Sequence, residues 1–526
     1  MNGAPAATSS RAILPHVWPS VVHMLADAAQ RSPTARALIC AGDELDYEQF
    51  AACVAGLALE LQAAGIGKGA RVALVMNNSL DIAIATFGVQ AAGAQVVPLN
   101  PAYTAAELAP MLENANAAGI IHDSATTQTL SSLIGAFSLR IEVGPASRRL
   151  TKWRNDRDLA ARMPLPDPDS LSTLQYTGGT TGRAKGVDLT HRAVSINVSQ
   201  REALLPTEPE AERILAITPL FHVYAVSMGL YLATYCKGTL VIMPRYRPEA
   251  VLQAIAEHRI TLMSGSPTIF IGLMGFEGFG RADLSSLRLC FSGASALSEG
   301  TLRRWESATG CGVVEGYGQS EAGPVLTYNP RDGVRKLGSV GVAVPMTEVQ
   351  IVDTNAGRQV LPAGMVGEIR ARGPQIMQGY RELPAETAQA LRDGWLYTSD
   401  IGELDEEGYL FIRDRKKEMV IVGGFNVYPR EVEDALFSHP AVQDAGVVGV
   451  PDEYRGEALV ATVVSADASL TEEALLEHLA GRLVKYKIPR EVRFVDALPK
   501  TSIGKTDKNQ LRSDARSATH TERTRQ

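Results

Sequence analysis

The segment LQYTGGTTGRAKGV, residues 174–187, carries the most specific chemical signal in the chain. The segment contains a run of glycines and threonines over residues 177–182, and a lysine follows at position 185. Glycine lets successive backbone N–H groups turn toward a ligand, threonine hydroxyls donate hydrogen bonds, and lysine adds positive charge, so the segment predicts a polyphosphate-binding loop. We assign to this loop Thr177, Gly178, Gly179, Thr180, Thr181, Gly182 and Lys185.

The loop differs from two common phosphate-binding motifs. A Walker A loop places lysine directly after its last glycine, followed by Ser or Thr, whereas Lys185 stands three residues after Gly182 and precedes Gly186. The segment also lacks the GxGxxG pattern of dinucleotide-binding folds. A flexible surface turn is the alternative interpretation, and it accounts less well for so many glycines and hydroxyls together.

Working outward from the loop, the hydropathy pattern predicts an α/β fold. Apolar strand-like runs alternate with helix-like runs over 45–123 and again over 214–314, as in βαβ units with parallel sheets. Residues 330–413 show short alternating runs separated by Gly and Pro, which favour a β-rich subdomain. Thr104 with Glu107, and Ser469 with Glu472, have the spacing of capping boxes and predict helix starts.

The pattern divides the chain into a large N-terminal part and a small C-terminal part. A chain of 526 residues exceeds what one core usually organises, so at least two domains are expected. The α/β pattern restarts after the charged run RDRKKE at 413–418. We predict a domain over 1–413, a hinge at 414–417, a small α+β domain over 418–512 and a disordered polar tail over 513–526.

Composition excludes several functional classes. A net charge of −7 gives no overall attraction to nucleic acid, and no apolar run approaches membrane-spanning length, so a soluble protein is expected. The five cysteines are widely spaced and never form a CxxC pair, which favours a reducing cytosol over a disulfide framework or a thiolate zinc site. The N-terminus lacks a secretory pattern, although Arg11 among Ser and Ala residues leaves mitochondrial import open.

Four further segments follow the loop along the chain. EGYGQSEAG (315–323) combines an aromatic ring with a hydroxyl and a carboxylate, groups suited to stacking on a purine and to ligating magnesium. DGWLYTSDIG (393–402) and IRDRKKEMVIVGGFNVYPREVE (412–433) lie downstream, and LPKTSIGK (498–505) ends on a lysine. A lysine beside a reacting phosphate offsets negative charge that grows in the transition state.

This ordered set of motifs resembles the signature of the adenylate-forming superfamily, which comprises acyl-CoA ligases, luciferases and peptide-synthetase adenylation domains. The resemblance covers roughly residues 40–512, and its motif strings are most similar to those of bacterial medium- and long-chain fatty-acyl-CoA ligases. Two positions depart from the family pattern: Ser320 replaces the usual threonine and keeps its hydroxyl, and Ser399 stands where many relatives have glycine.

The resemblance implies a role for each matched residue. Glu321 would anchor magnesium and Tyr317 would stack on adenine. Asp400 would accept hydrogen bonds from both ribose hydroxyls, Arg415 would reach the ribose or phosphate, and Lys505 would act in catalysis. The small domain would turn about Lys417. Further nucleotide contacts fall on Gly293, Ala294, Glu315, Gly316, Gly318 and Ser320.

The same resemblance locates the acyl and thiol sites. A tunnel for the pantetheine arm of coenzyme A would run beside Gly423 and Gly424. The acyl pocket falls on His222, Val223, Ser264, Gly265 and Gly341. His222 fits either a pocket wall or a satisfied core histidine, and the many small residues fit either a deep slot for an alkyl tail or a flat aromatic ring.

The implied activity is an AMP-forming acid–CoA ligase that uses ATP, Mg²⁺ and coenzyme A. A carboxylic acid and ATP would give an acyl-adenylate and pyrophosphate, and coenzyme A would then take the acyl group. A medium- or long-chain fatty acid is the favoured substrate. Aryl or heteroaryl acids, and a carrier-protein thiol as acceptor, remain alternatives, and the oligomeric state, a homodimer included, stays open.

Overall fold

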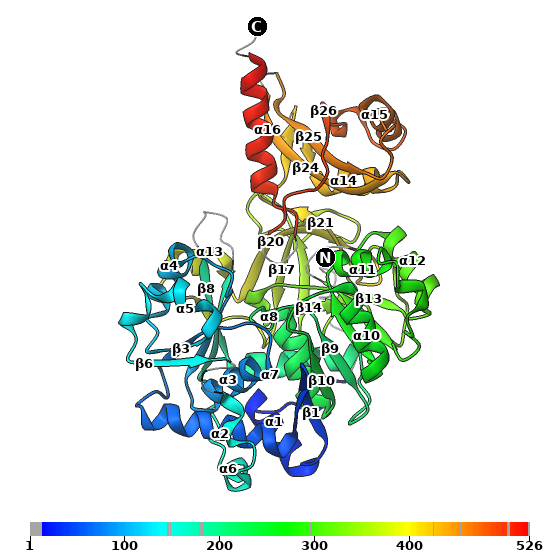
Figure 1. Cartoon of the computed structure of the whole chain (residues 1–526). Coiled ribbons are helices and arrows are strands. Elements are labelled where there is room, and N and C mark those ends of the chain that lie inside the picture. The colour runs from blue at the N-terminus through cyan, green and yellow to red at the C-terminus, as the bar shows by residue number, and fades with distance from the viewer. Residues whose placement is uncertain are drawn as a thin grey trace.

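A computed structural model describes residues 13–144, 147, 149–177, 184–293, 297–423, 425–452, 454–501 and 505–523. It shows a large N-terminal part with three sheets and a small C-terminal domain with a fourth sheet, which stands at the top of Figure 1 in orange and red. This is the α/β architecture that the sequence predicts. Among the described residues, no helix combines the length and apolar character needed to cross a bilayer.

Two large sheets form the centre of the N-terminal part. The first has the order β18-β8-β7-β4-β3-β5-β6 and the second β15-β14-β13-β12-β11-β9-β10-β1-β2. The strands of the first are β3 (Arg71–Val75), β4 (Gln95–Leu99), β5 (Gly119–Asp123), β6 (Leu139–Val143), β7 (Leu171–Thr177), β8 (Lys185–Thr190) and β18 (Gly379–Tyr380). Those of the second are β1 (Arg36–Cys40), β2 (Asp43–Asp46), β9 (Arg213–Ala216), β10 (Thr239–Ile242), β11 (Leu262–Gly265), β12 (Leu289–Ser292), β13 (Val313–Gly318), β14 (Val325–Tyr328) and β15 (Val342–Ala343).

The inner strands of both sheets pair in parallel, as the alternating pattern of strands and helices predicts. The helices that connect or cover these strands are α1 (Val21–Arg31), α2 (Tyr47–Ala63), α3 (Leu80–Ala91), α4 (Ala105–Ala115), α5 (Thr127–Leu130), α6 (Arg157–Ala161), α7 (His191–Leu204), α8 (Val223–Ala225), α9 (Leu232–Cys236), α10 (Pro248–His258), α11 (Pro267–Met274), α12 (Glu299–Thr309) and α13 (Pro384–Ala390). One continuous core joins both sheets to α2 and α3. Every residue of α3 is buried, so this helix has no solvent-facing side.

The third and fourth sheets lie later in the chain. The third contains β16 (Glu348–Val352), β17 (Gly367–Arg372), β19 (Leu391–Arg392), β20 (Trp395–Leu404) and β21 (Leu410–Arg415), which is the predicted β-rich segment. The fourth contains β22 (Val420–Val422), β23 (Phe425–Val427), β24 (Val442–Asp452), β25 (Gly456–Ser465) and β26 (Glu491–Phe494). The small domain adds α14 (Pro429–Phe437), α15 (Glu472–Ala480) and α16 (Lys508–Arg523).

Two local expectations need correction. Residues 513–523 continue α16 instead of forming a disordered tail, because Leu511 and Ala515 of this otherwise polar helix are buried against Val448 and Val450 of β24. The helix predicted to start at Ser469 starts at Glu472.

The second error has a local physical cause. The Thr471 side chain accepts the N–H of Ala474 and so acts as the N-cap of α15, while the Ser469 hydroxyl donates to Asp467 at 2.7 Å. At Thr104 the predicted capping box is present.

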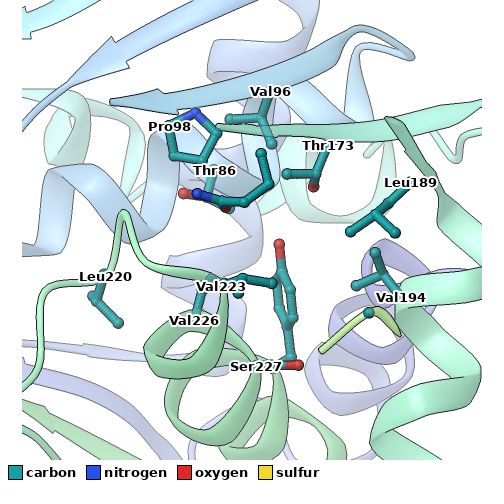
Figure 2. A pocket seen from close by; sticks show the side chains of 13 residues that line it. Thr86, Val96, Pro98, Thr173, Leu189, Val194, Leu220, Val223, Val226 and Ser227 are labelled. Atoms are coloured by element: carbon teal, nitrogen blue, oxygen red, sulfur yellow. The ribbon is translucent and has the colours of Figure 1, made fainter. Parts of the chain in front are cut away.

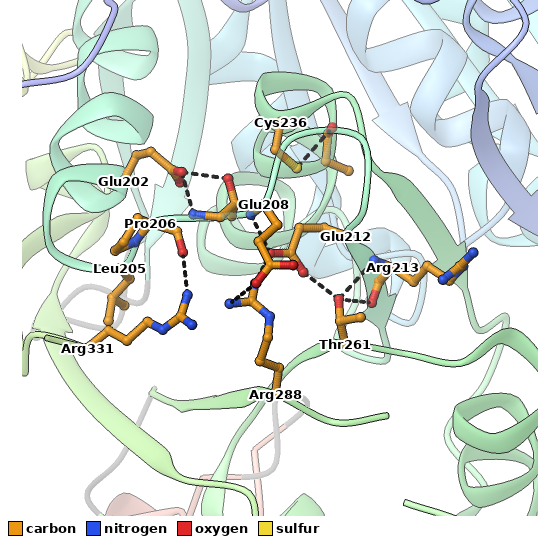
Figure 3. Close-up of polar contacts among 12 residues, drawn as sticks. Glu202, Leu205, Pro206, Glu208, Glu212, Arg213, Cys236, Thr261, Arg288 and Arg331 are labelled. Carbon is orange, nitrogen blue, oxygen red and sulfur yellow. Dashed lines mark hydrogen bonds and ion pairs between the residues drawn. The ribbon is translucent and has the colours of Figure 1, made fainter. Parts of the chain in front are cut away.

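A buried polar cluster joins the amino ends of three parallel strands (Figure 3). Glu212, 1% exposed and just before β9, accepts hydrogen bonds from the Thr261 hydroxyl before β11 and from the backbone of Glu208, and pairs with Arg288 before β12. Ligands of parallel α/β sheets bind at the carboxyl ends of the strands. This cluster lies at the amino ends, so we interpret it as structural.

Candidate active site

Asp400 is the centre of a polar group at the carboxyl end of β13. Tyr317 is the penultimate residue of that strand, and its hydroxyl donates a hydrogen bond to Oδ2 of Asp400 at 2.6 Å. Arg415 pairs with Asp400 across the β20/β21 ladder, and its Nε lies 3.7 Å from Oδ1. Burial raises the pKa of Asp400, and the charge of Arg415 and the Tyr317 bond oppose that rise. The arrangement offers a fixed carboxylate acceptor beside a cation, which suits a pair of sugar hydroxyls near a phosphate.

Glu321 forms a second group with the strand that follows the Gly/Thr loop. It lies in the short 3₁₀ turn Ser320–Ala322 and is 8% exposed. The Tyr380 hydroxyl donates to its Oε1 at 2.8 Å, and Nζ of Lys185 lies 4.9 Å from the centre of the Tyr380 ring. Burial raises the pKa of Glu321, whereas the charge of Lys185 acts to lower it. Thr177, at the end of β7, pairs with Lys185 in the β7/β8 ladder.

The chemistry of Glu321 is compatible with a magnesium ion that arrives on a nucleotide. Among the described residues, no group of three or more His, Cys, Asp or Glu side chains could hold a metal ion without other ligands. Mg²⁺ in nucleotide-dependent enzymes is often bound through one carboxylate plus substrate phosphates, so a single buried glutamate suffices.

Lys505 comes from the small domain and lies within electrostatic range of the Asp400 group. Its pKa falls to about 8, first through burial and then through the charge of Arg415, while the charge of Asp400 acts in the opposite direction. The pKa of His222 falls to about 4, first through burial and then through the charge of Lys505. Four residues widely separated in sequence, 222, 400, 415 and 505, therefore lie near one another in the fold.

The His222 ring has a structural contact of its own. Its Nδ1 accepts the N–H of Tyr224 at 3.3 Å, so the neutral imidazole caps the short helix α8. The ring therefore has a satisfied acceptor, as a structural histidine would, and it also lies near the Lys505 charge. Its place in an acyl-pocket wall stays a prediction.

The loops assigned to nucleotide binding lie at the carboxyl ends of β12 and β13. Gly293 follows β12, and a Cβ there would approach the Tyr224 ring to 3.0 Å. Glu315 is buried, and its Oε1 accepts the N–H of Leu297 at 2.9 Å; burial raises its pKa to about 7. Its carboxylate therefore stabilises the loop after Gly293.

The glycines of the EGYGQSEAG segment are needed for close packing. A Cβ at Gly316 would lie 2.3 Å from the Tyr328 ring, and one at Gly318 would lie 1.8 Å from the carbonyl oxygen of Pro324. These contacts fix the backbone on either side of Tyr317. Five loop residues, Gly178, Gly179, Thr180, Thr181 and Gly182, together with Ala294 and Gly424, lie outside the described residues.

A cavity between the two large sheets includes one predicted pocket residue, Val223 (Figure 2). The other four predicted acyl-pocket residues do not line it: His222, Ser264, Gly265 and Gly341. Gly341, with φ of 86°, is packed so closely that a Cβ would lie 1.9 Å from the Tyr328 carbonyl carbon. The rest of the lining comes from residues that the sequence analysis does not assign to the acyl pocket: Thr86, Val96, Pro98, Thr173, Gln175, Leu189, Val194, Leu220, Val226, Ser227, Tyr231 and Gly323.

The predicted hinge and tunnel residues lie in the turn and the hairpin that begin the small domain. Lys417 occupies the turn between β21 and β22, which the N–H of Glu418 closes by donating to the Arg415 carbonyl at 2.9 Å. Gly423 directly follows β22 and has a φ of 58°. Its N–H donates to the backbone carbonyl of Arg455 at 2.8 Å.

Sequence reasoning missed Tyr380. Its hydroxyl fixes Glu321 and its ring faces Lys185, yet it lies on the two-residue strand β18. A lone tyrosine outside any charged or glycine-rich pattern gives no chemical signal in sequence.

The Ser399 backbone predicts a gain of stability on substitution by glycine. Ser399 has φ of 61°, a region that costs an L-residue about 1 kcal/mol. We expect Ser399→Gly to raise the free energy of unfolding by about 0.5 kcal/mol, because the larger entropy of glycine in the unfolded chain offsets part of the relieved strain. Urea unfolding of the variant and the wild type would measure this change in the free energy of unfolding. Ser438→Gly, at φ of −72°, is the matched control and should not stabilise; equal effects at both sites would contradict the strain argument.

The comparisons with known proteins agree with this geometry. The model of the AMP-binding enzyme family matches residues 25–381, and that of the AMP-binding enzyme C-terminal domain matches 431–505. The chain therefore belongs to the AMP-binding enzyme family.

Its relatives narrow the class. A long-chain-fatty-acid–CoA ligase of Bacillus subtilis (strain 168) is 37% identical over 95% of this chain and 96% of its own. A feruloyl-CoA synthase of an Amycolatopsis species is also 37% identical, over 92% and 96%. Within the family, this chain is an AMP-forming acid–CoA ligase.

One solved relative appears in two forms that differ in shape. ATP-bound MatB from Rhodopseudomonas palustris, 31% identical, matches with a TM-score of 0.86 over 94% of this chain and 99% of its own. The apo form of the same enzyme gives 0.78 over 94% and 98%. The structure of this chain therefore superposes more closely on the ATP-bound form.

Proposed function

We propose that this ligase activates a medium- or long-chain fatty acid with MgATP and transfers the acyl group to coenzyme A. The proposal for the chemistry depends most on the proximity of Lys505, from the small domain, to Asp400 and Arg415. The acid carboxylate attacks the α-phosphorus of ATP, and pyrophosphate leaves. Charge grows on the phosphoryl oxygens during this step, so a nearby ammonium group lowers the barrier.

Each group of the site has a role in this first step. Asp400 accepts hydrogen bonds from the ribose hydroxyls, and Tyr317 positions the Asp400 carboxylate. Arg415 lies toward the phosphate. Lys185 and the Gly/Thr loop bind the outer phosphates, while Glu321 would hold a magnesium ion, which would offset the negative charge of the phosphates. In the second step a thiol attacks the mixed anhydride and AMP leaves, so Lys505 is no longer required.

The fatty acid assignment is supported by the fatty acid ligase among the relatives. The cavity of Figure 2 is too small for an acyl chain as it stands and would have to widen, but its walls fit an alkyl ligand. Its lining is mainly aliphatic, and Tyr231 is its one aromatic ring. A site with aliphatic walls accepts an alkyl chain by hydrophobic burial, at about 0.8 kcal/mol per methylene group. The cavity is bordered by the π-helical segment Val226–Tyr231, and such segments often occur at functional sites.

A hydroxycinnamic acid is the second candidate, because the feruloyl-CoA synthase is as similar in sequence as the fatty acid ligase. AMP release with coenzyme A, measured across octanoate, palmitate, ferulate, benzoate and malonate, would separate the candidates. We expect kcat/KM to rise with alkyl chain length and to be highest for a fatty acid. A preference for ferulate would contradict the fatty acid assignment. A preference for an acyl-carrier-protein thiol over coenzyme A would contradict the acceptor.

The Lys505 pKa predicts how the first step depends on pH. The ammonium form is required and is present below about pH 8 in the free enzyme. The kcat/KM of ATP–pyrophosphate exchange for ATP should therefore fall as pH rises through 8, approaching tenfold per pH unit. Thioester formation from supplied acyl-adenylate should not fall in this range. Parallel declines of both half-reactions would contradict the assignment.

A further inference from the structure

Asp414, the penultimate residue of β21, contacts a helix of the small domain. It is 7% exposed, and its Oδ2 accepts the backbone N–H of Arg430 at 2.9 Å. Arg430 lies in the first turn of α14, whose N-cap residue Tyr428 makes no side-chain capping bond. A carboxylate at a helix N-terminus satisfies a free N–H group and interacts favourably with the helix dipole. Asp414 thus supplies from β21 the cap that α14 lacks in its own segment.

Two cations of α16 connect α14 to the turn that follows β21. Nζ of Lys508 lies 2.9 Å from Glu433 of α14, and Arg512 pairs with Glu418. Burial would lower the pKa of Lys508, but the charges of Glu433, Asp414 and Glu418 together raise it. The α16 helix begins three residues after Lys505, so its position sets the position of that lysine.

These contacts lie on different sides of the turn at 416–418. The pairs of Lys508 with Glu433 and of Arg512 with Glu418 join residues of the small domain and would survive its rotation. The bond from Arg430 to Asp414 joins the small domain to a strand of the third sheet, and rotation about the turn would break it.

We propose that Asp414 is a positioning residue, which stabilises the orientation of the small domain that places Lys505 beside Asp400. Its carboxylate binds the N-terminus of α14 and faces the Lys508 charge, and so favours adenylate formation over the thioester step. The inference depends on the proposed two-step function.

The test is Asp414→Asn in the full-length protein, assayed in each half-reaction. Removing the charge weakens a buried charge-assisted hydrogen bond, so ATP–pyrophosphate exchange should slow about tenfold. Thioester formation from supplied acyl-adenylate should be unchanged or faster. Asp467→Asn is the matched control, because Asp467 also accepts a backbone N–H, from Ser469, but within an exposed turn of the small domain. Both half-reactions should be unchanged in that variant.

A second measurement is independent of activity. Tryptic cleavage at the hinge, after exposed Arg415 or Lys417, should be at least about threefold faster in Asp414→Asn than in the wild type without substrates. Lys508→Met provides a second variant if Asp414→Asn does not fold, with the same expected shift between half-reactions. Equal losses in both half-reactions, or unchanged exchange and cleavage, would overturn the proposal. Absence of wild-type exchange with every acid would instead reject the proposed function, while cleavage would still test Asp414.

Discussion

Lys505→Ala should reduce ATP–pyrophosphate exchange by about 10²- to 10³-fold and leave thioester formation from supplied acyl-adenylate within about threefold of wild type. The ammonium group acts on charge that develops when the carboxylate attacks phosphorus. It has no corresponding role when a thiol attacks the acyl carbon. The low pKa of Lys505 reflects burial near Arg415, so the charged form costs free energy until an anion enters. A triphosphate supplies that anion. The attraction between the Lys505 ammonium group and the phosphoryl oxygens therefore grows as negative charge develops in the reaction.

The control for this prediction is a lysine of the same loop. Lys500 pairs with Asp444 and donates to the Thr506 hydroxyl at 3.1 Å, at the base of the loop that carries Lys505. Lys500→Ala removes an equal charge near the same backbone and should reduce exchange by no more than about threefold. Comparable losses in the two variants would show that the loop needs its general fold and positive charge, and not an ammonium at 505 in particular.

Much of the fold could be predicted from local patterns. The runs RILAIT, TLVIM, TLMSG and LRLCFS contain β9, β10, β11 and β12, because a strand buried on both faces needs contiguous apolar residues. The capping box at Thr104 is visible in sequence since its two partners are three residues apart. What failed depends on tertiary contacts: α16 is stabilised by a few apolar residues against β24, and its remaining side chains give the polar composition of a tail.

The residues of the site also fall into those that could be predicted from sequence and those that could not. Residues that stand in a short motif, such as Glu321, Asp400 and Lys505, could be named as candidates from sequence, and their roles stay predictions. The partners that position them could not. Tyr380 reaches Glu321 from 59 residues away, and Asp414 reaches Arg430 across a domain boundary, so neither contact leaves a spacing in the chain. The cavity lining could not be predicted for the same reason, because β4, β7, α3 and the π-helical segment contribute only one to three residues each.

Glu321→Gln should lower adenylate formation by about 10²-fold and raise the Mg²⁺ concentration needed for half-maximal exchange. The amide keeps the size and one acceptor oxygen of the side chain but loses the charge that a hard divalent cation prefers. Burial already raises the pKa of Glu321, and an uncompensated buried carboxylate favours a cation in the site. A shift in the Mg²⁺ requirement is therefore the diagnostic result, since a merely structural loss would lower the rate at every Mg²⁺ concentration.

Tyr380→Phe is the matched control for Glu321→Gln. It removes the 2.8 Å hydrogen bond to the same Oε1 and keeps the carboxylate charge and the ring that faces Lys185. We expect a loss of less than about tenfold, with the Mg²⁺ requirement unchanged, because the phenol orients the carboxylate without binding the metal. If the two variants shifted the Mg²⁺ requirement equally, the metal role would belong to the network as a whole. If neither shifted it, Glu321 would act only through its packing, and the magnesium assignment would be wrong.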